Sequence, residues 1–158
     1  MYKIVIIISF LGLISCKKEG TQTTQIIEPL VKNDTIAVAT IALSDGTKVI
    51  SDWLELANFQ SELKAVANKN ITSEKELEQL INYLNKLKET IPEKFNKTAI
   101  QVRIKVIETE LLMFNQYVKE QEYKLANERK NRLLKAYNLF INQLETLLIK
   151  ERDYEEYH

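Results

Sequence analysis

Helix-breaking residues are almost absent from the long C-terminal part of this chain. Residues 51–158 contain no glycine and a single proline, Pro92. Relative to alanine, glycine costs a helix interior about 1 kcal/mol and proline about 3 kcal/mol, and these two residues also form most tight turns. A stretch of this length without them is unsuited to hairpins and irregular loops, so it predicts an all-α fold.

Apolar side chains within residues 51–158 recur three and four positions apart, in four segments. Each of the first three segments opens on a residue that suits a helix N-cap, and a glutamate or glutamine three positions later completes a capping box. Residues 68–70 and then Pro92 are the expected helix stops. The three predicted capping boxes are Asp52 with Glu55, Ser73 with Glu76, and Thr98 with Gln101.

The third and fourth segments carry the most regular apolar pattern, with steps of four and three residues that suit helices packed at small crossing angles. Between them lies the charged stretch 119–131, so the chain either turns near Asn127, a suitable N-cap, or continues as one rod of about 80 Å. A rod would leave much of its apolar face uncovered. We therefore predict a four-helix, mostly antiparallel bundle, with a long two-helix stalk carrying a shorter pair as the alternative. The seam residues are Ile100, Ile104, Ile107, Leu111, Phe114, Val118, Leu133, Tyr137, Phe140, Leu144 and Leu147.

The N-terminal sequence MYKIVIIISFLGLISC combines a charged residue, an apolar run and a cysteine. The run over 4–14 is too short to span a bilayer as a mature helix, and with Lys3 before it the segment has the layout of a secretory signal peptide. Its last four residues, LISC, resemble the lipobox of bacterial lipoproteins. The resemblance implies a signal peptide over 1–15, cleavage between Ser15 and Cys16, and a diacylglyceryl group with an N-acyl chain such as palmitate on Cys16.

Residues 16–34 then form the lipidated N-terminus and a polar tether, which would hold the domain about 20 to 25 Å from a membrane. Two or more acyl chains would make release from that membrane rare. Residues 35–50 alternate β-branched and small side chains before a turn signal at Asp45 and Gly46, which predicts a short β-hairpin or an extended segment. The triplet DTI around Thr35 resembles an acceptor for O-glycans in Bacteroidota, so Thr35 is either a modification site or part of a plain turn.

Residue types that most enzymes need are missing from the chain. The one histidine is the terminal His158 and the one cysteine is Cys16, so the chain offers no Ser–His or Cys–His pair, no zinc face and no internal disulfide. Lysine and arginine together number 22, as do aspartate and glutamate, so there is no basic surplus for nucleic acid. We expect no catalytic residue, no metal site and no cofactor besides the covalent lipid.

Three charged residues lie near the centre of the third segment. Glu108 and Glu110 are two positions apart, so their side chains diverge around a helix and cannot share one proton or metal ion. Arg103 lies at the margin of the apolar stripe, where its guanidinium either binds an anion or a carboxylate or stays in water above a buried stem. Trp53 and Phe59 in the first segment are predicted to close one end of the core.

The stretch IPEKFNKTAIQVRIKVIETELLMF, with DWLELANFQ upstream of it, resembles small helical lipoproteins of Bacteroidota that have no assigned function. The resemblance implies their compartment and a helical fold, and it brings no activity. We therefore expect a lipid-anchored protein of the cell envelope, with the outer membrane favoured, at its periplasmic face or surface. It would act as a non-enzymatic interaction or scaffold module and bind an unknown envelope protein. The alternative is a carrier of a small ligand or metal, with a cavity lined by Arg103 and an unpaired glutamate.

Overall fold

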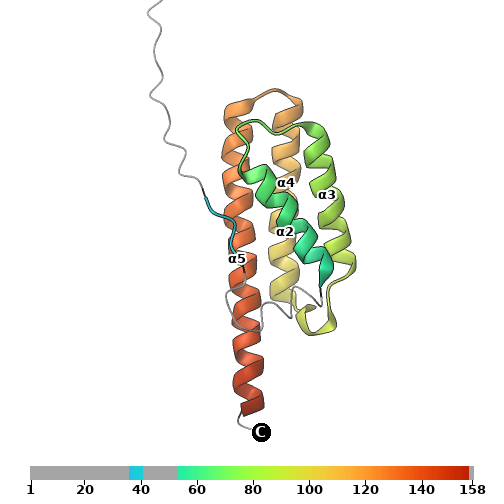
Figure 1. Ribbon diagram of the computed structural model, residues 1–158, viewed down its shortest axis with the longest axis vertical. Coiled ribbons are helices and arrows are strands. Elements are labelled where there is room, and N and C mark those ends of the chain that lie inside the picture. Colours follow the sequence, from blue (N-terminus) through green and yellow to red (C-terminus); the bar gives the residue numbers. More distant parts are fainter. Residues whose placement is uncertain (1–35, 41–52, 157–158) are drawn as a thin grey trace, which may run out of the picture. The chain divides into compact units, whose positions relative to one another are not determined.

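The computed structural model describes residues 36–40 and 53–156, with side chains as far as Asp153, and all of them belong to one compact unit. Within this part of the chain there is no strand and four α-helices pack together, so the predicted all-α helical bundle is confirmed (Figure 1). The elements in chain order are α2 (Leu54–Ala67), α3 (Glu74–Glu89), the short 3₁₀ helix η1 (Glu93–Phe95), α4 (Thr98–Lys119) and α5 (Tyr123–Glu156).

The start of α3 is capped as predicted. The Glu76 N–H donates to the Ser73 hydroxyl (3.4 Å), and the Ser73 N–H donates to the Glu76 carboxylate (2.9 Å). The helix ends at Glu89, shortly before Pro92, and α2 likewise ends directly before the predicted stop at 68–70. Local sequence signals therefore determine where α3 begins and where α2 and α3 end.

The capping box predicted at Asp52 involves a residue outside the described ones. The third predicted start is confirmed, since α4 begins at Thr98, although no side chain caps the helix there. α2 has Trp53 as its N-cap and no side-chain cap, and Trp53 is buried in the core, so its position determines where the helix begins. α4 has Lys97 as its N-cap, again without a side-chain cap, and the buried Phe95 anchors the chain just upstream. A side-chain cap contributes about 1 kcal/mol, and burial of a large aromatic side chain contributes about 1.5 to 3 kcal/mol, so burial prevails.

A tight turn separates α4 from α5, as the bundle prediction requires, but the prediction that Asn127 caps the second helix is wrong. α4 ends in a Schellman motif, in which Gln121 N–H donates to Val118 O (3.1 Å) and Glu122 N–H donates to Tyr117 O (2.9 Å). Gln121 has a φ of 60°, the left-handed conformation that glycine usually supplies in this motif. The turn closes before Asn127, which therefore lies inside α5.

The last two helices are the longer pair, as predicted. α2 and α3 contain 14 and 16 residues, whereas α4 and α5 contain 22 and 34. Figure 1 shows the C-terminal, red part of α5 continuing past the ends of the other helices. The shorter helices therefore cover only part of α5.

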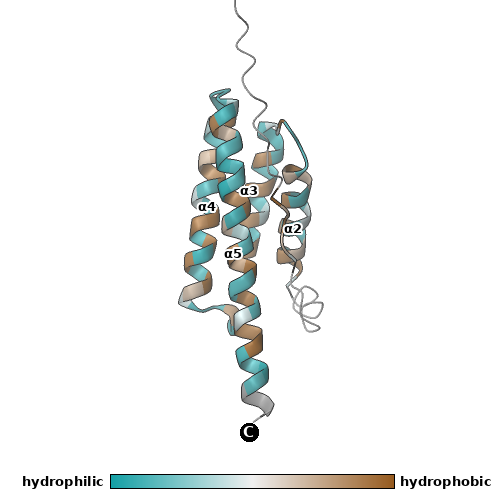
Figure 2. Ribbon diagram, turned by 90° about the vertical axis from the view of Figure 1, so that its left-hand side faces the viewer, coloured by the Kyte–Doolittle hydropathy of each residue, from teal (hydrophilic) through white to brown (hydrophobic). Residues whose placement is uncertain are grey.

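The interface between α4 and α5 contains the predicted seam. Its residues are buried except for Val118 and Leu147, which are half-buried and pack against the core. Figure 2 shows the apolar residues as brown bands that recur along both helices. A second apolar row of α5 is also buried, namely Leu134, Ile141 and Leu148. The steps of four and three residues thus identify the interface correctly.

Five aromatic rings, which we call the aromatic end, fill the core where α2, η1 and α5 meet. Trp53 stacks on Phe95 with 6.1 Å between ring centroids, and it meets Phe140 edge-on at 6.3 Å. Tyr137 lies 5.9 Å from Phe59 and 6.1 Å from Phe140. Each of the five residues is at most 1% exposed, so the prediction that Trp53 and Phe59 belong to the core is confirmed.

Several sequence predictions fall outside the described residues. These are the signal peptide, Cys16, the tether, Thr35 and the turn expected at Asp45 and Gly46. Of the expected hairpin only residues 36–40 are described, and they form neither helix nor strand. Across 36–40 and 53–156, no helix combines the length and apolarity that crossing a membrane requires.

Candidate functional site

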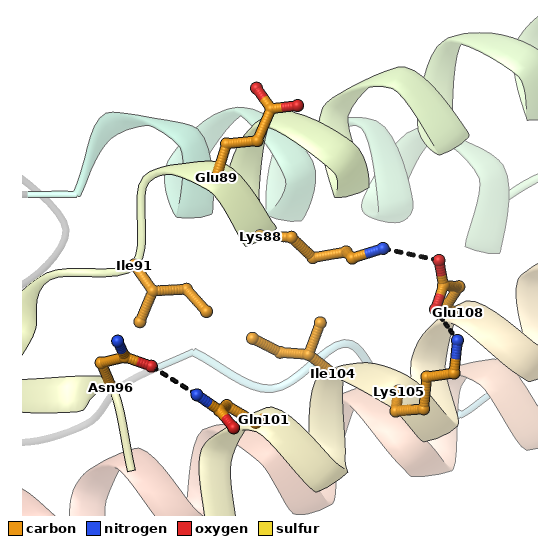
Figure 3. Close-up of a pocket in the computed structure, with 8 residues that line it drawn as sticks. All are labelled: Lys88, Glu89, Ile91, Asn96, Gln101, Ile104, Lys105 and Glu108. Carbon is orange, nitrogen blue, oxygen red and sulfur yellow. Dashed lines mark hydrogen bonds and ion pairs between the residues drawn. The ribbon is translucent and has the colours of Figure 1, made fainter. Parts of the chain in front are cut away.

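A hollow of about 400 Å³ lies between the end of α3 and the first half of α4 (Figure 3). Two isoleucines supply apolar surface, and charged and amide side chains surround them, a mixture that is typical of ligand pockets. The lining residues are Lys88, Glu89, Ile91, Asn96, Gln101, Ile104, Lys105 and Glu108. We call this the α3–α4 hollow.

The connection 90–97 forms one wall of the α3–α4 hollow. The Thr90 hydroxyl donates to Lys86 O (2.8 Å) at the end of α3, and η1 then places Phe95 in the core. Ile91 is left half-buried between these two fixed points, and Figure 3 shows its side chain directed toward Ile104 of α4. The apolar part of the hollow therefore follows from where the chain leaves one helix and enters the next.

Glu108 is the central charge of the α3–α4 hollow. Its carboxylate accepts from Lys88 Nζ of α3 (2.6 Å) and from Lys105 Nζ on its own helix (2.7 Å). The hydrogen bonds from Lys105 and Lys88 hold the pKa of Glu108 below its ordinary value. A carboxylate that stays ionised and is neutralised by two ammonium groups is unsuited to act as a general acid.

The remaining polar groups of the hollow pair with one another or face outward. Gln101 Nε2 donates to Asn96 Oδ1 (2.6 Å), while Figure 3 shows Glu89 directed away from the hollow. Among the described residues that line the hollow, none is Ser, Thr, Cys or His. Among the residues that the structure describes, no group of three His, Cys, Asp or Glu side chains is placed to hold a metal ion. The hollow can offer hydrogen bonds, paired charges and apolar contact.

The charged residues singled out on α4 are not brought together. Arg103 is half-buried, does not line the α3–α4 hollow, and forms no ion pair with a described residue. Glu110 pairs with Arg129 of α5 (3.2 Å), whose guanidinium lies 5.9 Å from the Tyr117 ring. Glu108 and Glu110 therefore bind different helices, as their spacing predicts, and an anion contact at Arg103 stays a prediction.

Apolar side chains also face solvent on α4. Val102 is 54% exposed and Val106 is 41% exposed, and together with Thr109 they line a shallow hollow of about 250 Å³. Residues three and four positions apart share one face of a helix. We call Val102, Val106 and Thr109 the α4 outer face.

A second site lies where residues 36–40 cross α2 and α5, and Figure 1 shows this cyan segment beside α5. Asn138 of α5 uses both ends of its side-chain amide. Its Oδ1 accepts from Ala39 N–H (2.8 Å), and its Nδ2 donates to Ala37 O (2.9 Å). One side chain therefore satisfies two main-chain groups of this segment.

Gln60 of α2 completes this second site. Its Nε2 donates to Ala39 O (2.9 Å) and to the Tyr137 hydroxyl (2.9 Å), and the residue is only 9% exposed. Burial raises the pKa of Tyr137 well above its ordinary value, so the hydroxyl stays protonated at neutral pH. We call the surface formed by Gln60, Tyr137 and Asn138 the α2–α5 groove.

Lys130 is a buried cation outside both sites. It is 8% exposed, and its Nζ donates to Lys69 O (2.7 Å) in the connection between α2 and α3. Burial lowers the pKa of Lys130, because an ammonium group loses hydration there. Its role is structural, since it ties α5 to that connection.

Comparison of the chain with protein-family models, with curated proteins and with solved structures finds no match.

The sequence does not predict Lys88, Gln60 or Asn138 as site residues. Gln60 directly follows Phe59 within the apolar face of the first helix, and a polar residue at such a position is the one signal that could have identified it. Lys88 and Asn138 resemble many other polar residues of their helices. Only the packing of distant segments separates them from the rest.

Proposed function

We propose that this protein is a lipid-anchored, non-enzymatic interaction or scaffold module of the bacterial cell envelope. The diacylglyceryl and N-acyl chains on Cys16 would confine it to a membrane, with the outer membrane favoured, and its partner would be another envelope protein. The N-terminal charged residue, the apolar run and the lone cysteine after a small residue support this address.

The observation that carries the interaction role is the packed interior of the bundle. Buried apolar side chains from all four helices form one continuous cluster in the described part of the chain. A carrier would need Arg103 and an unpaired carboxylate to face a cavity. Because Arg103 lies away from the α3–α4 hollow and Glu108 has two lysine partners, the carrier is the less well supported alternative.

We also propose that the bundle is mostly antiparallel. Residues 120–122 connect α4 to α5 within one tight turn, and the two helices pack against each other. Helices that are joined by so short a connection and that still pack together run in opposite directions in known bundles. Such a bundle would leave the α4 outer face open to a partner.

Crosslinking in cells, followed by pull-down of the full chain, tests the interaction role. The pair Val102→Asp and Val106→Asp puts charge on the α4 outer face and should lose the captured protein. The matched pair Asn82→Asp and Asn85→Asp, at exposed positions of α3, should keep it. Recovery of no reproducible partner would contradict the role, whereas a partner kept by both variants would contradict only the contribution of the α4 outer face.

Metabolic labelling with palmitate tests the anchor separately. The wild-type chain should incorporate the label and Cys16→Ser should not, because the lipid would be bonded to the cysteine sulfur. Ser15→Ala keeps a small residue before the cysteine and should still be labelled. A wild-type chain that takes up no label would contradict the proposed lipid anchor and the membrane location that depends on it.

A further inference from the structure

We propose that the α2–α5 groove is a binding site for an extended peptide of a partner protein, and that residues 36–40 of the chain are its resident occupant. The partner segment would displace residues 36–40 and take over their contacts. This inference goes beyond the proposed function, and neither the lipid anchor nor the α4 outer face enters it.

The first support is that the groove binds main-chain atoms. Its hydrogen bonds to the segment reach Ala37 O, Ala39 N–H and Ala39 O, two from Asn138 and one from Gln60. The Asn138 amide thus replaces the peptide group of a neighbouring strand, as in the recognition of peptides by strand addition. Every residue except proline carries these groups, so the contacts do not require this particular sequence.

The second support is the simple side-chain pattern of the occupant. Ile36 and Val38 are half-buried against the core, whereas Ala37 between them is exposed. Figure 2 shows the segment as a brown, apolar run beside α2. Ala39 is half-buried against the core as well, and Thr40 is exposed, so the groove suits apolar, β-branched residues at the first and third positions and a small residue at the fourth.

The third support is that the groove is formed by the helices themselves. Gln60 Nε2 donates to the buried Tyr137 hydroxyl as well as to the segment, so that bond holds its side chain in place when the segment leaves. Ile36, Val38 and Ala39 pack against the core from outside, so their release would uncover part of its surface but would leave the contacts between the helices in place. A site that keeps its shape without a ligand loses less entropy on binding.

A fluorescently labelled peptide with the sequence TIAVATIA and a solubilising lysine tail is the probe. Ile36→Asp with Val38→Asp empties the groove in the full-length chain without touching a helix, and Ala39→Pro is a second route because it removes the N–H that Asn138 binds. Circular dichroism and thermal unfolding establish that the helices are retained in both variants. Fluorescence anisotropy then measures peptide binding.

The emptied chain should bind the peptide at least about tenfold more tightly than the wild-type chain, in which residues 36–40 compete. Adding Asn138→Leu should weaken binding about tenfold, the effect of losing two hydrogen bonds. Asn142→Leu, at an exposed asparagine one turn further along α5, should leave the affinity unchanged. A peptide methylated on the nitrogen that corresponds to Ala39 should also bind about tenfold more weakly.

Failure of the emptied, helical chain to bind the peptide would overturn the proposal, as would equal binding by the wild-type chain. An affinity that is unchanged both by Asn138→Leu and by methylation of the peptide nitrogen would overturn the proposal that the groove recognises main-chain atoms. Light scattering measures the molar mass in solution, and we expect the wild-type chain to be a monomer. A dimer that dissociates in the Ile36→Asp and Val38→Asp variant would assign the groove to residues 36–40 of a second copy and overturn the assignment to a partner protein.

Discussion

The seam between α4 and α5 and the α2 side of the bundle, where the aromatic end meets the α2–α5 groove, are stabilised by different contacts. Along the seam, apolar side chains recur every three or four residues, and all of them except Tyr137 and Phe140, which also belong to the aromatic end, contribute by burial alone. On the α2 side, Trp53, Gln60 and Asn138 each occupy a position that no neighbour could take over. Repetition makes an interface tolerant of substitution, whereas contacts made once make a region sensitive to single changes.

The largest loss of stability is expected from a substitution at Trp53 in the aromatic end. Trp53→Ala removes a ring that contacts Phe95 and Phe140, and we expect it to lower the free energy of unfolding by about 3 to 5 kcal/mol. The adjacent Leu54 is 61% exposed, so Leu54→Ala should change it by less than about 0.5 kcal/mol. In the seam, Ile107→Val should cost only about 0.5 to 1.5 kcal/mol. Denaturant unfolding measures each value, and similar losses for Trp53→Ala and Ile107→Val would contradict the expected difference between the aromatic end and the seam.

The next effect concerns the buried amide. Gln60→Leu leaves the Tyr137 hydroxyl and Ala39 O without their donor, and we expect a loss of about 1 to 3 kcal/mol in the free energy of unfolding. Adding Tyr137→Phe should restore part of that loss, because the orphaned hydroxyl is then gone. A double-mutant cycle measures the coupling between the two positions. Strictly additive losses would show that the two side chains do not act as a unit.

A smaller effect is expected in the turn that ends the seam. Gln121 adopts a φ of 60°, so Gln121→Gly should raise the free energy of unfolding by about 0.5 to 1 kcal/mol as the strain on a side chain with a Cβ is removed. Glu120 has a right-handed conformation, so Glu120→Gly should lower stability by a similar amount. Thermal unfolding of the two variants compares adjacent positions directly, and opposite signs are the expected result.

The smallest effect belongs to the ion pairs of the α3–α4 hollow, which lie outside both regions. The folded-state pKa of Glu108 is lowered from an ordinary value of 4.5, so its stabilising contribution is present above that pH and is lost as the pH falls through the folded value. Partly exposed pairs of this kind contribute less than about 1 kcal/mol. Glu108→Gln should therefore flatten the stability profile slightly between pH 5 and the acid limit, as urea unfolding at several pH values measures. An unchanged slope would show that the two lysines do not favour the ionised carboxylate.

The sequence predicts those parts of the molecule that local chemistry determines. Steps of four and three residues identify the seam, and Ser73 with Glu76 identifies the start of α3, since these signals lie within one or two helical turns. The turn at Gln121 could not be predicted from the sequence, because a glutamine adopts the left-handed conformation that a glycine at this position would have indicated. The α2–α5 groove could not be predicted for another reason. It is formed by residues that are far apart in the sequence and that share no sequence pattern.

The hydrogen bonds of Asn138 to the segment 36–40 join residues 99 and 101 positions apart in sequence. A growing chain emerges N-terminal end first, so Ala37 and Ala39 leave the ribosome well before the asparagine that will hold them. At about 5 to 20 residues per second, the delay is about 5 to 20 seconds. Loop closure over such a distance also makes this contact late in folding compared with the local contacts of the helices. Residues 36–40, which are largely apolar, therefore lack their hydrogen-bond partners while the bundle assembles. During this interval a chaperone would bind them.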